Sequence, residues 1–280
     1  MTTSEPFASS LTPEEEGKIK ELAAAVALTV QASSASASHI AFCTRGTYLR
    51  YLRARSWNVH KATQMLEATL KWRSEFQPDE ITWDDMEEEA ARGKVFVLDH
   101  PDKDGRPVVF MRPRKEKYGG DNDQRLRWVV YVMETASRVA DASSPDGKMT
   151  WLIDFVGYDR KNQPPWKVSL QTLTIVQNHY PERLGKAVNF DPPMLFELFY
   201  KAIRPFVDPV TRDKLVFLHQ KSDAAEGMEK QFHLEYLDEP ICGKLEEDGM
   251  WNFEIYKEKM KKQEHEARLN IEAAKKHMVA

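Results

Sequence analysis

From about residue 94 onward, short apolar runs alternate with segments of helical length, and this alternation restricts the fold more than any other feature. The run MTWLIDFVG (149–157) is apolar almost throughout, which is typical of a strand buried on both faces. Two more such runs follow, KAVNF and KLVFLH. A helical segment precedes each of the three runs, at 121–141, 167–180 and 193–206. Strands joined by crossovers of this length predict an α/β fold with a mixed, mostly parallel sheet covered by helices.

The residues before this alternation are expected to be helical. Thr12, Pro13 and Glu15 have the pattern of a capping box at the start of a helix. Asn58 is a suitable N-cap for a further helix over 59–75, in which apolar residues recur at helical spacing. Between these helices, the stretch SSASAS is expected to be a flexible connection.

Three regions follow from these patterns. We predict an N-terminal helical region at 1–92 and a sheet-containing domain at 93–248, which opens with two strands around the glycine-containing turn of DKDGRP. The remainder, 249–280, is expected to form a charged C-terminal helix that packs on the body by one face.

The composition excludes several classes of protein. The chain has 280 residues, of which 41% are hydrophobic and 30% charged, as in ordinary globular proteins. A net charge of -4 gives no global attraction for nucleic acid. Cys43 and Cys242 make neither a disulfide framework nor a metal-ligand spacing, so a reducing compartment is expected. No apolar run is long enough to span a membrane and no signal peptide is evident, so we expect a cytoplasmic protein.

The sequence lacks the common catalytic motifs. It contains no GxGxxG after a strand, no phosphate-binding GxxxxGKS or GxxxxGKT, no HExxH and no GxSxG. The eight histidines are scattered, and none pairs with another four residues away. His179 and His219 fall at the ends of elements, where a hydrogen-bonded structural role is the simpler interpretation and a polar contact near a cavity is the alternative. We therefore expect no enzyme activity, no metal and no cofactor.

The expected helix 193–206 is apolar over most of its circumference. Its polar residues Glu197, Lys201 and Arg204 form a single narrow stripe. Such a helix is either buried on both sides, or it walls an apolar cavity on one side and meets a lipid bilayer on the other. The pattern alone leaves both interpretations open.

A polar turn follows this helix directly. Asp208 is suited to cap a short helix with Pro209 at its first position. Thr211 and Lys214 are three residues apart and would share a face. A hydroxyl and an ammonium beside a helix N-terminus are suited to a phosphate, whereas turns of this composition are commonly only solvated.

Several motifs occur in one order along the chain: YLRARSWNVHKATQMLEATLKWR, DKDGRPVVF, WLIDFVG, NHYPERLGKAVNF and PFVDPVTRDKLVFL. In this order and spacing they resemble the CRAL-TRIO lipid-binding family, and within it the yeast-type phosphatidylinositol transfer proteins, over roughly 40–245. The resemblance implies an N-terminal helical tripod followed by a lipid-binding domain. In that domain the sheet would form the floor of an apolar pocket, and a gate helix would close this pocket.

By its position, 193–206 resembles the gate helix, which opens when a single lipid is lifted out of a membrane. Exchange requires that contacts with the lipid and contacts with the bilayer nearly balance. The residues that the resemblance assigns to the gate and the acyl-chain pocket are Met194, Leu195, Phe196, Leu198, Phe199, Ile203 and Phe206.

The resemblance also implies a site for the headgroup of phosphatidylinositol. Arg55, the second Arg of RAR, would hold the phosphate together with Thr211 and Lys214. Glu182 of YPER and Asp102 of DKDGRP would belong to the same polar network. Arg offers two parallel donors to a phosphate, Lys a point charge and Thr a neutral donor. Structural roles stay open as well: Arg55 pairing with an acid between domains, Glu182 capping, and Asp102 making the turn.

The sequence departs from the family pattern where other members bind phosphatidylcholine through hydroxyl groups. By this resemblance, the corresponding residues of this chain are Val109, Met133, Met149 and Trp151, none of which carries a hydroxyl. A quaternary ammonium prefers aromatic neighbours and a phosphate requires donors. A second ligand held by apolar contacts, such as a sterol, is therefore the better match for these positions.

We thus predict a lipid-binding and lipid-transfer protein that extracts phosphatidylinositol from membranes and exchanges it between them. It would touch the membrane surface transiently, act as a monomer, bind phosphatidylinositol as its ligand, and be placed to present this lipid to a lipid kinase for phosphoinositide synthesis. Two alternatives remain. One is a carrier of a sterol or other neutral hydrophobic ligand, and the other is a lipid-regulated protein-interaction module that docks through its C-terminal helix.

Overall fold

The computed structural model describes residues 11–32, 36–116, 121–162, 165–204, 212–222 and 224–279. The helices before the sheet are α1 (Pro13–Ala32), α2 (Ser36–Phe42), α3 (Arg45–Ala54), α4 (Val59–Phe76) and α5 (Trp83–Ala91). The later helices are α6 (Asn122–Ser143), α7 (Trp166–His179), α8 (Met194–Ile203), α10 (Ala224–Gln231) and α11 (Phe253–Val279).

The strands form one mixed sheet in the order β1-β2-β3-β4-β5. Their bounds are β1 (Val95–Val97), β2 (Val108–Met111), β3 (Met149–Asp154), β4 (Leu184–Phe190) and β5 (Leu215–Leu218). β1 and β2 pair antiparallel, and the other three pairs are parallel. The predicted mixed, mostly parallel sheet is therefore confirmed.

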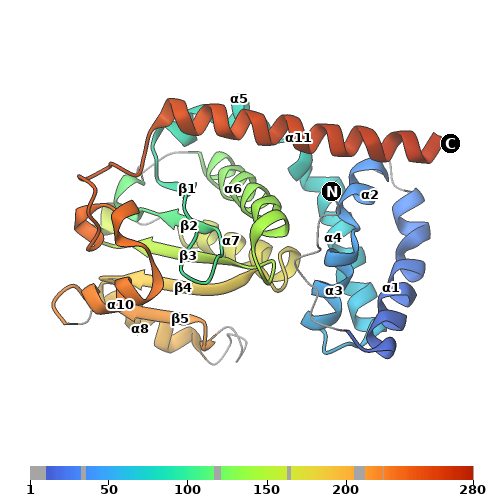
Figure 1. The fold of residues 1–280 in the computed structure, drawn as a ribbon, viewed down its shortest axis with the longest axis horizontal. Helices are drawn as coiled ribbons and strands as arrows, with labels where there is room; N and C mark the ends of the chain where they lie inside the picture. Colours follow the sequence, from blue (N-terminus) through green and yellow to red (C-terminus); the bar gives the residue numbers. More distant parts are fainter. Residues whose placement is uncertain are drawn as a thin grey trace.

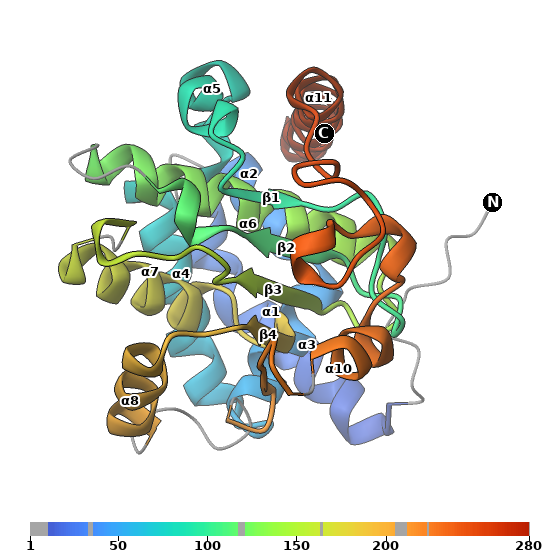
Figure 2. The same cartoon turned by 90° about the vertical axis from the view of Figure 1, so that its left-hand side faces the viewer.

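The crossovers between parallel strands place α6, α7 and α8 on one face of this sheet. Because the strands follow one another in chain order and such crossovers are right-handed, each passes on the same side. Figure 2 shows these helices together on one side of the strands, with α10 on the other.

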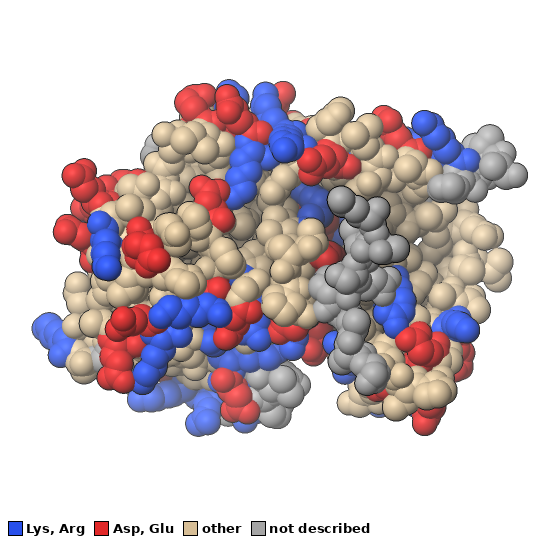
Figure 3. Space-filling view, in the orientation of Figure 1, with Lys and Arg blue, Asp and Glu red and all other residues tan. Residues whose placement is uncertain are grey.

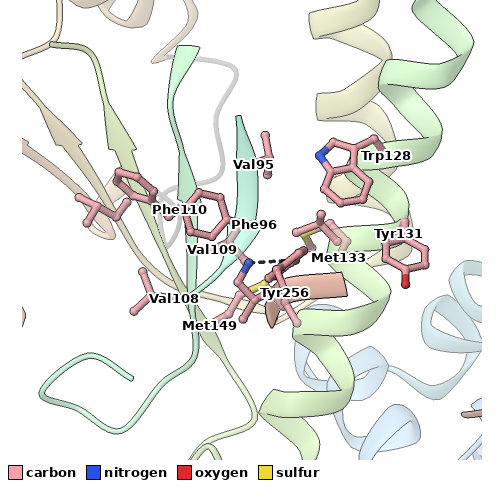
Figure 4. Close-up of a cluster of buried hydrophobic side chains, with 14 of the residues drawn as sticks. Val95, Phe96, Val108, Val109, Phe110, Trp128, Tyr131, Met133, Met149 and Tyr256 are labelled. Carbon is pink, nitrogen blue, oxygen red and sulfur yellow. Dashed lines mark hydrogen bonds between the residues drawn. The ribbon is translucent and has the colours of Figure 1, made fainter. Parts of the chain in front are cut away.

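The main core lies between α6 and the strands. Trp128 and Met133 of α6 are buried and pack in one cluster with Val109, Phe110 and Met149 of the strands. Figure 4 shows Met133 reaching from its helix toward the strands. The long apolar face of α6 is therefore buried against the sheet.

The N-terminal helices have a core of their own. α1, α3 and α4 pack around buried leucines, among them Leu22, Leu49 and Leu66. The predicted N-caps are present: Glu15 N–H donates to Thr12 Oγ1 at 3.2 Å, and Lys61 N–H donates to Asn58 Oδ1 at 2.9 Å. The predicted N-terminal helical region is thus confirmed.

α11 spans both parts of the molecule (Figure 1). It packs along α2 and α5, and it buries Tyr256 and Met260 in the main core. Polar contacts secure it to the start of α5, where the Trp83 N–H donates to Glu264 Oε2 at 2.8 Å and Lys261 pairs with Asp84 at 2.8 Å. The expectation of a charged helix that packs by one face is met.

The structure corrects two local expectations. Half of SSASAS, expected to be a flexible connection, belongs to α2, which begins at Ser36 and is held by α11. The short helix α10 was not expected at all. α8 ends at Ile203, and the part of the expected 193–206 helix beyond Arg204 lies outside the described residues. The region boundaries at 92/93 and 248/249 stay predictions.

Candidate functional site

The parallel strands β3, β4 and β5 all begin along the same border of the sheet, which is called the edge here and is not an edge strand. Three of the predicted headgroup residues lie at this edge. Asp102 lies in the β1–β2 turn beside the start of β3, Glu182 lies just before β4, and Lys214 lies just before β5. Thr211 and Phe206 lie outside the described residues. The edge is therefore the candidate site.

Asp102 is a buried turn residue. Its Oδ1 accepts hydrogen bonds from the backbone N–H groups of Asp104 and Arg106, at 3.0 and 2.8 Å. Its Oδ2 accepts from the Thr150 hydroxyl at 2.5 Å, and only 3% of the residue is exposed. Gly105, with φ of +78°, completes the turn where a side chain would be strained. Asp102 thus fixes the DKDGRP turn onto β3.

Glu182 has a more accessible carboxylate. The residue adopts a left-handed backbone conformation, with φ of +59°, between α7 and β4. Its Oε2 lies 3.7 Å from Nζ of Lys148, the residue that precedes β3. The pair is partly exposed, so both side chains are available to a polar ligand.

Lys214 is fixed through its backbone. Its carbonyl accepts a hydrogen bond of 2.8 Å from the Ala187 N–H of β4, and its side chain is half-buried. Lys214 and Glu182 therefore precede neighbouring strands, β5 and β4, at the same edge.

Arg55 comes from the N-terminal helical region. It caps the C-terminus of α3, and its Nη1 donates to the Ala54 carbonyl at 2.9 Å. Within the described part of the chain its guanidinium makes no ion pair. The structure thus places Arg55 at a helix end without bonding it to the other predicted site residues.

An ion triad of two buried guanidiniums and one partly exposed carboxylate links α3 to the loop that carries Glu182. Arg50 of α3 binds Asp141 of α6 at 3.1 Å, and Arg183 binds both oxygens of the same carboxylate at 2.7 Å. Burial, and next the charge of Arg183, lower the pKa of Arg50 to about 9, so it stays charged at neutral pH. The triad therefore sets the position of α3, and with it Arg55, relative to Glu182. Sequence patterns gave no sign of it, because the partners are far apart in the chain.

A second salt-bridge group at the edge was also not predicted. Arg106 binds Asp146 at 2.8 Å, and Lys186 of β4 binds Asp104 at 3.3 Å. Arg106 lies directly over Gly185, where an added Cβ would approach Arg106 Cδ to 2.7 Å. The signal of this group in the sequence was Lys186, a charged residue at the start of the run KAVNF.

Opposite charges are interspersed on the face of the molecule seen in Figure 1. Figure 3 shows blue and red side chains alternating in a band across the lower part of the face seen in Figure 1. At the edge itself, Lys148 and Lys186 each pair with a carboxylate, so anion binding there depends on particular side chains rather than on a uniformly basic surface.

The predicted gate helix packs by one side and exposes the other. Phe196 contacts Phe155 and Phe217, with ring centroids 4.8 and 6.5 Å apart. Met194 and Leu198, one turn apart, are 77% and 54% exposed. In the polar stripe, Glu197 lies 3.6 Å from His219 Nε2. The side chains of Leu195, Phe199 and Ile203 lie outside the described set, although their backbone belongs to α8.

α7 adds exposed apolar side chains that were not predicted. Leu170 and Leu173 are both exposed, and α7 lies on the same face of the sheet as α8 (Figure 2). Together with Met194 and Leu198, they are exposed apolar side chains on two helices that cover one face of the sheet.

Three of the four positions considered for a second ligand are core residues. Val109, Met133 and Met149 are buried and pack against one another in the main cluster (Figure 4). Trp151, which pairs with Val109 in register, is only partly buried. A second ligand at these positions stays a prediction.

Histidine 179 belongs to the interface between α4 and α7. Its ring stacks on Trp72 with centroids 4.3 Å apart, and Nδ1 lies 3.0 Å from the Thr69 hydroxyl. Burial, and next the charge of Arg73, lower the pKa of His179 to about 4. The ring is therefore neutral near pH 7 and has a structural role.

No group of three or more His, Cys, Asp and Glu side chains among the described residues is arranged to hold a metal ion. None of their helices is both long and apolar enough to cross a bilayer.

The family of the chain follows from comparison with known proteins. Residues 91–243 match the CRAL/TRIO domain, and residues 18–68 match the CRAL/TRIO N-terminal domain. The chain therefore belongs to the CRAL/TRIO family. The expected resemblance is confirmed by these matches.

Individual relatives include yeast proteins. The phosphatidylinositol transfer protein PDR17 of Saccharomyces cerevisiae is 33% identical over 81% of this chain and 64% of its own length. A CRAL-TRIO domain-containing protein of Schizosaccharomyces pombe is 33% identical over 77% of this chain, but this match covers only 20% of that protein. The chain therefore spans between a fifth and about two-thirds of these relatives.

A solved structure supports the fold. The crystal structure of Sfh5 matches with a TM-score of 0.63 over 88% of this chain and 91% of that one. The sequence identity is 20%, so this likeness shows the fold alone.

Proposed function

We propose that this chain binds a single phosphatidylinositol molecule and transfers it between membranes. The observation that carries the proposal is the placement of Glu182 and Lys214 before neighbouring strands, with Lys148 beside Glu182. A cation and a carboxylate at one sheet edge match the two parts of this headgroup, since Lys attracts the phosphate and Glu accepts hydrogen bonds from inositol hydroxyls.

The positions of Arg55 and Asp102 also support the proposal. The Arg50–Asp141–Arg183 triad holds α3, which Arg55 caps, against the loop that carries Glu182. Asp102 would act indirectly, because its oxygens are engaged by its own turn and by Thr150. Arg55 and Lys214 would bind the phosphate, and Asp102 would keep the edge in shape.

The apolar half of the ligand would meet α8 and α7. Met194 and Leu198 expose apolar surface on α8, and Leu170 and Leu173 do so on α7. Burying one such side chain against lipid contributes about 1.5–3 kcal/mol. The same surface would contact the bilayer when a lipid is exchanged, which accounts for a transient association with the membrane.

Similarity to PDR17, which is named a phosphatidylinositol transfer protein, also supports the proposal of phosphatidylinositol transfer. A lipid held by its headgroup at a protein edge would also be accessible to a lipid kinase. Presentation for phosphoinositide synthesis is therefore the cellular role that we propose for the complex.

The direct test is transfer of labelled phosphatidylinositol between vesicles. Arg55→Ala and Lys214→Ala should each lower the transfer rate roughly tenfold or more, because a hydrogen bond to a charged group contributes about 1.5–3 kcal/mol. Arg53→Ala on the same helix and Lys221→Ala beyond β5 are the matched controls and should transfer normally. Equal transfer by all variants would refute the headgroup site.

A sterol or other neutral lipid is the second candidate cargo. Val109, Met133 and Met149 offer no hydroxyl, and the partly buried Trp151 offers an aromatic surface. A variant that lost phosphatidylinositol transfer but still extracted cholesterol from vesicles would support this cargo beside the first.

A further inference from the structure

A cavity of about 160 Å³ lies where α3, α4, α6 and α11 meet. Four arginines line it: Arg50 of α3, Arg73 of α4, Arg138 of α6, and Arg183 before β4. Residues of α11, among them Asn270, close one side. The cavity therefore joins the N-terminal helices, the sheet domain and the C-terminal helix.

Three carboxylates on the cavity wall pair with three of these guanidiniums. Arg73 binds Glu134 and Asp79, each at 2.8 Å. Burial raises the pKa of Glu134, but the charge of Arg73 and its hydrogen bonds outweigh burial and bring this pKa to about 2, so the pair is ionised. Asp141 is left to balance both Arg50 and Arg183.

Arg138 is the remaining cation. Its Nη2 donates to the Thr135 hydroxyl at 3.3 Å, and no carboxylate lies within ion-pair distance of it in the described part of the chain. Four guanidiniums therefore face three carboxylates among the described lining residues, which leaves an excess of one positive charge. A cavity of this sign attracts an anion.

Buried donors without partners point to a ligand as well. Ser137 Oγ, Arg138 Nε and Arg73 Nε make no hydrogen bond among the described residues, although Ser137 is only 8% exposed. Leaving such groups unpaired costs about 1–3 kcal/mol each, so native proteins usually satisfy them. Glu134, Ser137, Arg138 and Asp141 lie three or four residues apart on one face of α6, and all four residues line the cavity.

We propose that this cavity is a second anion site, which binds a phosphate group through Arg138, Ser137 and the Arg50–Arg183 pair. Its volume corresponds to roughly five water molecules, enough for one phosphate with a few waters. The site is distinct from the headgroup edge, because the Arg183 guanidinium binds Asp141 whereas Glu182 binds Lys148. A bound phosphate would connect α6 to the N-terminal helices and hold the two regions together.

The test uses the full chain with inorganic phosphate as the probe. Thermal unfolding is compared in phosphate and in chloride at equal ionic strength, and binding is measured by titration calorimetry. Phosphate at a concentration of tenfold its Kd should raise the midpoint temperature of thermal unfolding of the wild type by roughly 2–5 °C. Arg138→Gln should weaken phosphate binding roughly tenfold or more, and Ser137→Ala should weaken it by a smaller factor.

Arg127→Gln is the matched control, since Arg127 lies on α6 but does not line the cavity. This variant should respond to phosphate as the wild type does. Circular dichroism of each variant confirms that it is folded before binding is compared.

The phosphate could come from solution or from a membrane lipid, and a second arm distinguishes these sources. Co-sedimentation with vesicles of phosphatidylcholine and phosphatidic acid that is lost in Arg138→Gln would assign a lipid phosphate. A midpoint shift with inorganic phosphate that is lost in the same variant would assign a soluble one. Responses that are equal in wild type and Arg138→Gln, or absent in both arms, would overturn the proposal.

Discussion

The guanidinium of Arg183 binds both oxygens of the Asp141 carboxylate, each at 2.7 Å. Arg50 of α3 shares that carboxylate, so one side chain of α6 links the N-terminal helices to the loop before β4. Arg55 caps the C-terminus of α3, and Glu182 directly precedes Arg183. The alignment of the candidate headgroup residues therefore depends on a contact that none of them makes.

Replacing this carboxylate should destabilise the protein. Asp141→Asn leaves two buried guanidiniums without their counter-charge, at a cost of about 1–3 kcal/mol in the free energy of unfolding, because Asp141 itself is 42% exposed. Urea unfolding measures the change. Asp123→Asn, an exposed position on α6, should cost less than about 1 kcal/mol. Equal costs would show that the shared carboxylate does not hold the regions together.

The turn that carries Asp102 should depend on one hydroxyl. Thr150→Val removes the donor to a buried carboxylate oxygen and should lower the free energy of unfolding by about 1–3 kcal/mol. Thr150→Ser keeps the hydroxyl and should recover most of that loss. If Val and Ser at this position proved equally stable in urea titrations, the hydrogen bond would not be what fixes the turn.

Stability should depend on pH through His179. Its pKa of about 4 in the folded chain lies below the unfolded value near 6.5. Its contribution is therefore fully present above about pH 6.5 and is lost as the pH falls toward 4, because the unfolded chain binds the proton more readily. His179→Phe keeps a ring against Trp72. It should reduce the slope of the free energy of unfolding against pH between pH 4 and 6.5, by an amount that corresponds to at most one bound proton. An unchanged slope in pH-dependent urea unfolding would contradict this assignment.

The exposed side of α8 should matter for transfer and not for stability. Met194→Ser and Leu198→Ser remove apolar surface that is largely in water. The free energy of unfolding should therefore change by less than about 0.5 kcal/mol. Transfer of phosphatidylinositol between vesicles should fall several-fold, since less apolar area meets the bilayer. Leu28→Ser on α1, where Leu28 is 78% exposed, is the control and should transfer normally. A matching loss in Leu28→Ser would indicate a nonspecific effect.

The parts of the fold that local rules govern could be predicted from the sequence. The Asn58 cap and the apolar run of β3 depend on neighbouring residues, and the order of strands and helices then determined the sheet. α2 was missed because SASHIAF has no apolar period and is held by α11 from the far end of the chain. α10 was missed because a short segment with a central glycine carries little helical signal.

The candidate site was only partly predictable for the same reason. Glu182 and Asp102 came from motifs, and the structure places them at one edge with Lys214. The Arg50–Asp141–Arg183 triad joins residues distant in sequence, which no periodicity reveals. The role of Asp102 as a fully engaged turn residue likewise required the position of Thr150.

The most direct measurement of the central claim is the identity of the lipid that the purified protein carries. After incubation with vesicles of mixed phosphatidylinositol, phosphatidylcholine and cholesterol, native mass spectrometry should show one phosphatidylinositol per wild-type chain. The double variant Arg55→Ala, Lys214→Ala should carry little or none, whereas Arg53→Ala, Lys221→Ala should carry the wild-type amount. Recovery of cholesterol alone, or equal phosphatidylinositol in all three proteins, would contradict the account.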